Sequence, residues 1–276
     1  MTENFTRGII GDSFVTEIIL TAVAKQIGED TSDVYIYCKS DERRKYFREQ
    51  YNVNAVVDAD EFLSNVKILV LAFSADDDFA NELENFSEKI PHDTLIISYV
   101  NGMKISALEK IFPNHAIIRA VMSPMIVSGA GIGAYVVGSV SSVDSESLAQ
   151  FVMSQLGKVI KVSSEDEFEK VAKLIFGGTF YISTAINALT ESGINNGLSV
   201  EKSQTIVAEV VRGILKTLTS SDDVIKYLIK QAEGEKEAFK VGKKILEEYG
   251  IISTLSKAFD SADVKEIFKF RYHYWE

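Results

Sequence analysis

The residues best placed to do chemistry lie in the first turn, Gly11–Val15, which follows the apolar run Arg7–Ile10 and opens a helix-like segment. A glycine in such a turn lets the backbone approach a pyrophosphate, which the N-terminus of the following helix attracts. The usual pattern is G-x-G-x-x-G, and this chain keeps its first glycine. The hydroxyl of Ser13 can bond a phosphate, whereas the charge of Asp12 repels one unless its side chain points away. The resulting cofactor-binding candidates are Gly11, Asp12, Ser13, Phe14 and Val15.

The end of the second predicted strand bears on which dinucleotide would bind. An enzyme that uses NAD usually carries an acidic residue there, which bonds the ribose 2′-hydroxyl. This chain has Lys39 and Ser40 instead, a cation and a hydroxyl that suit a 2′-phosphate, so NADP(H) is predicted over NAD(H). Arg43 and Arg44 follow one turn later. This basic cluster is either part of an anion site or an ordinary solvated helix face.

Alternating strand-like and helix-like segments up to about residue 163 position these candidates. Short, nearly continuous apolar runs of this kind are typical of strands buried on both faces of a parallel sheet. The sequence therefore predicts an α/β fold, a Rossmann-like doubly wound parallel sheet over residues 1–163. The predicted strands are RGII, DVYIYC, KILVLAF, TLIISYV, AIIRAVM, GAYVVGSV and KVIKVS, and the predicted helices between them include DERRKYFREQY, DDDFANELENFSEKI and KISALEKIF.

After Ser163 the apolar period becomes helical, and we expect an all-helical domain over residues 164–276. Ser164 and Glu167 have the spacing of a capping box, which predicts the start of a long helix. Several apolar stripes in this half have few helices to pack against. We therefore expect a homodimer, or a higher homo-oligomer, formed through the helical domain.

Composition excludes several classes of protein. A formal net charge of −11 argues against a general nucleic-acid binder. No apolar run approaches the roughly 20 residues that span a membrane, and the N-terminus does not read as a secretory signal. The single cysteine, Cys38, excludes internal disulfides and a cysteine-based metal cluster. We expect a cytoplasmic protein with a small-molecule substrate and without a metal, a nucleic-acid partner or a membrane.

The order of these segments resembles the pyrroline-5-carboxylate reductase family over nearly the full length. The turn RGIIGDSFVT is similar in register to the family's I-G-F-I-G-x-G-N-M-A, and ISYVNGMKISALEKIF to ISIAAGVTIASLE. In the helical half, FGGTFYISTAINALTESGINNGLSVEKS is similar to GSGPAYVFLFIEALADAGVKLGLPREEA. The resemblance implies a Rossmann domain, a helical domain that dimerises by intertwining, and NAD(P)H-dependent reduction of a cyclic imine in proline biosynthesis.

The resemblance also supplies site candidates. The family's LAVKP after the fourth strand corresponds to a segment beginning at Leu71, and MPNTP after the sixth strand places its asparagine at Ser123. Thr179 stands where GSGPAY has proline, and the glycines before it would let a ligand or a partner helix approach closely; the alternative is a helix kink. The further cofactor-binding candidates are Ala72, Phe73, Ser74, Asn101, Gly102 and Ser123. The substrate-binding candidates are Gly178 and Thr179, with Thr179 as the catalytic candidate.

Departures from the family pattern leave two other functions open. The family's S-P-G-G-T-T loop falls near GEKEAF, residues 234–239, where two glutamates would repel an anionic substrate. The first alternative is therefore a non-catalytic Rossmann-fold dimeric scaffold or sensor. The second is a β-hydroxyacid dehydrogenase-like enzyme, since VAKLIFGG resembles that family's AKLVNN helix with Lys173 as its general acid.

Overall fold

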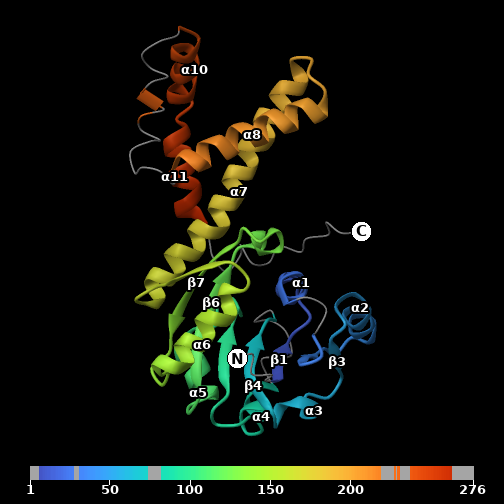
Figure 1. Ribbon diagram of the computed structural model, residues 1–276. Helices are drawn as coiled ribbons and strands as arrows, with labels where there is room; N and C mark the ends of the chain where they lie inside the picture. The colour runs from blue at the N-terminus through green and yellow to red at the C-terminus, as the bar shows by residue number, and fades with distance from the viewer. Residues whose placement is uncertain are drawn as a thin grey trace. The chain divides into compact units, whose positions relative to one another are not determined.

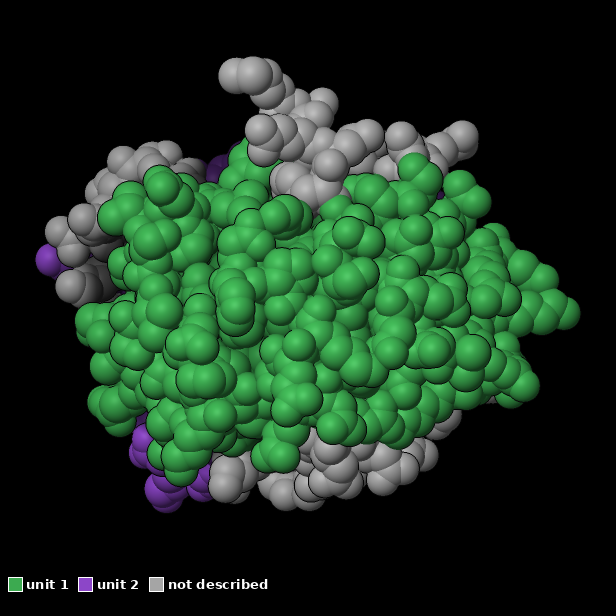
Figure 2. All heavy atoms as spheres, turned by 90° about the horizontal axis from the view of Figure 1, so that it is seen from below, with its two compact units in different colours: residues 1–176, 263–276 green, residues 177–262 purple. Residues whose placement is uncertain are grey.

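The computed structural model describes residues 6–27, 31–73, 82–218, 227, 229–230 and 237–262. The chain divides into two compact units, coloured separately in Figure 2. Unit 1 comprises residues 1–176 together with 263–276, and unit 2 comprises residues 177–262. The predicted boundary between residues 163 and 164 falls at the start of a helix rather than between these units, and it stays a prediction.

Unit 1 is built on an eight-stranded sheet in the order β3-β2-β1-β4-β5-β6-β7-β8 (Figure 1). Its first six strands have the 3-2-1-4-5-6 order of a doubly wound dinucleotide-binding sheet, which confirms the predicted fold class. The strands are β1 (Thr6–Ile10), β2 (Val34–Tyr37), β3 (Asn54–Val56), β4 (Val66–Leu71), β5 (Leu95–Ser98), β6 (Ala116–Met122), β7 (Ile132–Val137) and β8 (Lys158–Lys161).

The sheet departs from an all-parallel arrangement at β7, which runs antiparallel to β6. The connection from Met122 to Ile132 holds only the short 3-10 helix η2 (Pro124–Ser128), and a parallel crossover needs a dozen or more residues. Ser123 begins η2 by accepting a hydrogen bond from Met125 N–H, and Gly129 ends it in the left-handed region. β8 then pairs parallel to β7.

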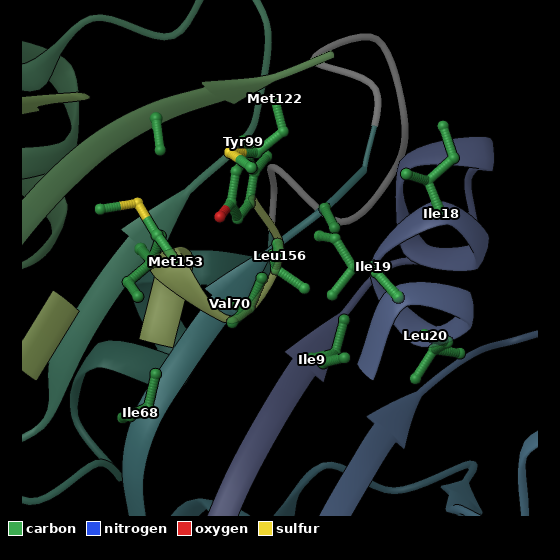
Figure 3. Packing of buried hydrophobic residues seen from close by; sticks show 14 of the residues in the cluster. Ile9, Ile18, Ile19, Leu20, Ile68, Val70, Tyr99, Met122, Met153 and Leu156 are labelled. Carbon is green, nitrogen blue, oxygen red and sulfur yellow. The ribbon is translucent and has the colours of Figure 1, made fainter. Parts of the chain in front are cut away.

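Helices cover both faces of the sheet, which explains why the central strands β4, β5 and β6 are almost wholly buried. The helices of unit 1 are α1 (Phe14–Ile27), α2 (Asp41–Tyr51), α3 (Asp60–Leu63), α4 (Leu83–Ser87), α5 (Ile105–Ile111), α6 (Val143–Ser154) and the first part of α7 (Glu165–Asn195). Residues of α1, α2 and α6 bury one face, and residues of α3, α4 and α5 bury the other. Figure 3 shows the first of these cores, where Ile19 of α1 and Met153 of α6 lie over Ile9 and Val70.

The sequence prediction missed β3 and α3, which are only three and four residues long. The predicted helix over residues 76–90 is described only from Glu82, and α4 forms its later part. The predicted cap of α7 is present in altered form. Ser164 accepts from Glu167 N–H at 3.2 Å, but the Glu167 carboxylate accepts from Ser163 instead of Ser164.

The described residues of unit 2 form helices joined by short turns, with no strand among them. It contains the remainder of α7, α8 (Val200–Leu218), α10 (Glu237–Glu248) and α11 (Ile251–Ser261). A left-handed Gly197 turns the chain between α7 and α8, and a Cβ on Gly193 would lie 2.8 Å from Ser203 Oγ. The absence of a side chain on Gly193 lets the start of α8 come close to the end of α7 at this turn.

Candidate functional site

The first turn packs its backbone tightly against the end of β4. Gly11 has a φ of +130°, and a Cβ at this position would lie 2.3 Å from the Ala72 carbonyl oxygen. Its N–H donates to the Tyr37 carbonyl at the end of β2 at 3.3 Å. Only glycine fits here, because both the backbone conformation and the space exclude a side chain. The turn therefore sits at the switch point between β1 and β4, as in a dinucleotide-binding sheet.

Ser13 turns its hydroxyl into the protein. The hydroxyl donates to the Ala72 carbonyl at 2.7 Å and accepts from Val15 N–H at 3.2 Å. Thr16 is buried and donates to the same carbonyl at 3.0 Å. The two hydroxyls therefore fasten the start of α1 to the end of β4, and Phe14 and Val15 begin α1 as predicted. A contact between Ser13 and a phosphate stays a prediction.

Asp12 faces β2. Its carboxylate lies 3.5 Å from the Cys38 thiol, and its carbonyl accepts from the Arg43 guanidinium at 3.0 Å. Burial and the neighbouring Asp12 charge raise the pKa of Cys38 to about 11, so this thiol stays protonated and is a poor nucleophile. Asp12 thus places a negative charge beside the end of β2.

The two predicted 2′-phosphate ligands after β2 already have partners within the chain. Lys39 forms an ion pair with Glu82, with 2.5 Å between Nζ and Oε1. The Ser40 hydroxyl accepts from Arg43 N–H at 3.3 Å and caps the N-terminus of α2.

The arginines of the basic cluster hold the local fold together. Arg43 pairs with Glu17 at 2.8 Å and stacks over the Phe47 ring at 4.6 Å. Arg44 is buried, where it pairs with Asp41 and donates to the Lys39 carbonyl at 2.8 Å. The cluster is therefore not a plain solvated face, and its role as an anion site stays a prediction.

The other cofactor candidates of unit 1 follow β4, β5 and β6 at the same edge of the sheet. Ala72 and Phe73 are buried, and Ala72 carries the carbonyl that receives both hydroxyls of the first turn. Asn101 and Gly102 form a turn after β5, with Gly102 at a φ of +77°. Ser123 is buried at the start of η2, which packs against α1. Ser74 lies outside the described residues.

The substrate candidates belong to unit 2. Gly178 and Thr179 lie within α7, where both are half-buried, and a Cβ on Gly178 would meet no atom within 4 Å. Gly177 contacts Tyr181 instead, since a Cβ there would lie 3.1 Å from the tyrosine ring. In the predicted substitute for the S-P-G-G-T-T loop, residues 234–236 and the side chains of residues 237–239 lie outside the description.

At the carboxyl edge of the sheet, the backbone has the glycine turn of a dinucleotide-binding sheet, whereas the side chains depart from the usual G-x-G-x-x-G pattern. The close approach of Gly11 to Ala72 shapes the tight turn before α1, and a pyrophosphate at the N-terminus of this helix stays a prediction. Within the described ranges, no group of three or more His, Cys, Asp or Glu residues could hold a metal ion. No described helix is both long and apolar enough to cross a membrane.

Sequence reasoning missed two residues of this edge, Tyr37 and Glu82. The Tyr37 hydroxyl donates to Glu82 Oε2 at 2.7 Å, while the other carboxylate oxygen faces Lys39. Burial and this acidic neighbour raise the pKa of Tyr37. No spacing in the sequence links Glu82 to the end of β2, because the two segments meet only through the fold.

Comparison with known proteins places this geometry in a family context. No protein-family model matches the chain. It is 24% identical over 257 residues to a pyrroline-5-carboxylate reductase from Synechocystis, covering 92% of this chain and 94% of that relative. A Plasmodium falciparum pyrroline carboxylate reductase solved with NADP bound has a TM-score of 0.83 at 19% identity, with 96% and 97% of the chains covered.

A second solved structure agrees. The pyrroline-5-carboxylate reductase of Coxiella burnetii has a TM-score of 0.77 at 23% identity, with 97% of this chain and 98% of that one covered. The likeness in sequence and in fold extends over both units. It confirms the resemblance read from the residues: the chain is similar to pyrroline-5-carboxylate reductases in sequence and in fold over most of its length.

Proposed function

We propose that this chain is an NADP(H)-dependent oxidoreductase of the pyrroline-5-carboxylate reductase type, which reduces a cyclic imine by hydride transfer. The observation that carries the proposal is the fit of Gly11 against the Ala72 carbonyl at the switch point of a Rossmann-order sheet. Relatives with this name align over both units of the chain, which supports a reductase over a β-hydroxyacid dehydrogenase or a scaffold.

The chain's own residues would bind and orient the two reactants. A bound dinucleotide supplies the hydride, and the protein contributes mainly position. Gly11 and the N-terminus of α1 would hold the pyrophosphate, while Asn101, Gly102 and Ser123 would hold the nicotinamide end. In unit 2, the Thr179 hydroxyl would bond the substrate carboxylate, and Gly178 would leave room for it.

A coupled pair of measurements tests the activity. Purified full-length chain is mixed with NADPH and pyrroline-5-carboxylate, and the loss of the reduced-nicotinamide absorbance is followed. We expect steady turnover, with Thr179→Ala raising KM for the imine while the Kd for NADPH is unchanged. Binding of NADPH without any turnover of the imine would instead favour the non-catalytic scaffold or sensor.

We further propose a preference for NADP(H) over NAD(H), because Lys39 and Ser40 follow β2 in place of an acidic residue. Lys39→Ala is expected to raise KM for NADPH more than KM for NADH. Lys45→Ala is the matched control, since Lys45 is exposed on α2 and paired with Glu49. An equal effect of Lys39→Ala on both nucleotides would remove the argument for a 2′-phosphate.

We also propose that the working form is a homodimer, located in the cytoplasm. Large apolar side chains are exposed along its helices, including Ile206 and Val210 of α8 and Ile245 of α10. Exposed apolar surfaces on this scale are typical of protein interfaces. A second copy of the chain is the partner we propose, and the measured mass in solution tests it.

A further inference from the structure

Glu82 brings a carboxylate to the end of β2 from a distant part of the chain. One carboxylate oxygen lies 2.5 Å from Lys39 Nζ, and the other accepts a hydrogen bond of 2.7 Å from the Tyr37 hydroxyl. Both oxygens of Glu82 are therefore engaged by groups that belong to β2 or directly follow it. The cation predicted to meet a 2′-phosphate has a negative partner before any ligand arrives.

Packing fixes this arrangement while leaving it open to solvent. The buried Tyr37 ring contacts Phe86 of α4 edge to face, with 5.5 Å between the ring centroids. Glu82 directly precedes α4, so this contact ties the carboxylate to β2. The side chains of Lys39 and Glu82 keep 39% and 30% of their exposure, which leaves the ion pair accessible to a ligand.

The position of the Lys39–Glu82 ion pair determines how it would affect the binding of a dinucleotide. In a sheet of this order, the adenosine ribose lies beyond the carboxyl end of the second strand. A phosphate monoester there carries a charge of about −1.5 to −2 and must compete with Glu82 for Lys39. A free 2′-hydroxyl is uncharged and can donate a hydrogen bond to a carboxylate.

Neighbouring cations do not make up for the engaged lysine. Arg43 pairs with Glu17 and donates to the Asp12 carbonyl, and Arg44 is buried against the Cys38 carbonyl at 2.6 Å. Each arginine holds together the fold around the end of β2. A ligand that recruited either one would have to break those contacts.

We infer that Glu82 is a specificity-determining residue, which weakens the binding of a 2′-phosphorylated dinucleotide by pairing with Lys39. The inference rests on the proposed function, because it assumes that a dinucleotide binds at this edge. It predicts that the wild-type chain prefers NADPH only modestly over NADH. Removing the charge of Glu82 would then release Lys39 and sharpen the preference.

The test is a calorimetric titration of full-length wild type and Glu82→Gln with NADPH and with NADH. Glutamine keeps the size of the side chain and can still bond Tyr37. We expect Glu82→Gln to lower the Kd for NADPH by about fivefold or more, the scale of a half-exposed ion pair, with little change for NADH. Glu84→Gln is the control, because Glu84 is exposed on α4, two residues after Glu82. It removes the same charge and should leave both Kd values unchanged.

A double variant tests whether Glu82 acts through its ion pair with Lys39. If Glu82 acts by pairing with Lys39, the gain in NADPH affinity should disappear when Glu82→Gln is made in Lys39→Met. Three outcomes would overturn the inference but leave the proposed function in place. They are a gain that persists in Lys39→Met, an equal gain in Glu84→Gln, and an unchanged ratio of Kd values in a folded Glu82→Gln. Failure of the wild type and Glu82→Gln to bind either nucleotide overturns both.

Discussion

The two units differ in how far they bury their apolar residues. In unit 1, strand residues such as Ile36 and Leu69 are fully buried between helices on both faces of the sheet. In unit 2, Ile252 of α11 is 80% exposed and Leu189 of α7 is 57% exposed. Unit 1 therefore has a core complete within one chain, whereas the helices of unit 2 have apolar faces that one copy does not cover.

This difference in burial suggests that unit 1 binds the nucleotide and that unit 2 mediates assembly. A complete core can hold the first turn in one geometry, because Gly11, Ser13 and Thr16 are all fixed against Ala72. A helical unit with uncovered apolar faces gains stability only when another surface buries them. Changes to unit 1 should therefore act on folding and nucleotide binding, and changes to the exposed apolar faces of unit 2 should act on assembly.

The largest expected effect comes from Arg119, which is 2% exposed on β6. It pairs with Glu165 at 3.0 Å and with Glu169 at 2.7 Å, and stacks on Phe168. Arg119→Ala should lower the free energy of unfolding by about 2–3 kcal/mol, because it empties a buried site and removes the partner of two half-exposed carboxylates. Chemical denaturation measures this loss, and a cost below about 1 kcal/mol would show that unit 1 does not depend on this internal pairing.

A charge on the apolar face of α11 should break the assembly without unfolding unit 1. Ile252→Glu is expected to weaken self-association by about tenfold or more, because the carboxylate would be buried in an apolar interface. Sedimentation at several concentrations measures it. Ser253→Glu adds the same charge on the other side of the helix, where Ser253 is exposed, and should assemble normally. Equal behaviour of the two variants would contradict an interface on this face.

Alanine variants of two glycines, one in each unit, allow the stability of the units to be compared directly. Gly11→Ala should cost about 1–3 kcal/mol, since the new Cβ meets the Ala72 carbonyl and the backbone conformation is strained. Gly213 lies in α8 with no atom within 4 Å of a Cβ, so Gly213→Ala should stabilise the helix by about 0.5–1 kcal/mol. Thermal unfolding of both variants measures the contrast. Destabilisation by Gly213→Ala would mean that a partner surface closes over this glycine.

The smallest expected effect is a pH dependence in unit 1. His115 is buried beside the Pro91 carbonyl, and burial holds its pKa below the usual range. The folded state therefore binds the proton less readily than the unfolded state, so stability is greatest above pH about 6.5 and falls as the pH drops below it. His115→Phe should flatten this part of the stability profile, and an unchanged slope would assign it to other groups.

Much of the fold was predictable because its signals are local. Continuous apolar runs predicted seven of the strands, and the change of period after Ser163 predicted the long helix α7. β3 was missed because three residues carry no period. The direction of β7 depends on the length of the η2 connection rather than on the strand's own residues.

For the candidate site, the sequence could predict which residues lie at the carboxyl edge of the sheet but not which residues they contact. Strand ends identify the carboxyl edge, so Gly11 and Lys39 were placed there from sequence order, and the family resemblance placed Ser123 there. The partners of those residues were not, because the contacts of Ser13 with Ala72 and of Lys39 with Glu82 join segments that only the fold brings together. Whether these residues hold a cofactor stays a prediction.

The most direct measurement is a calorimetric titration of the purified chain with NADPH, with Gly11→Ala as the paired variant. The account predicts micromolar binding by the wild type and at least a tenfold weaker interaction for the variant, because the new Cβ pushes the first turn away from Ala72. No heat and no thermal stabilisation of the wild type by NADPH or NADH would contradict the account, leaving a Rossmann fold without its nucleotide.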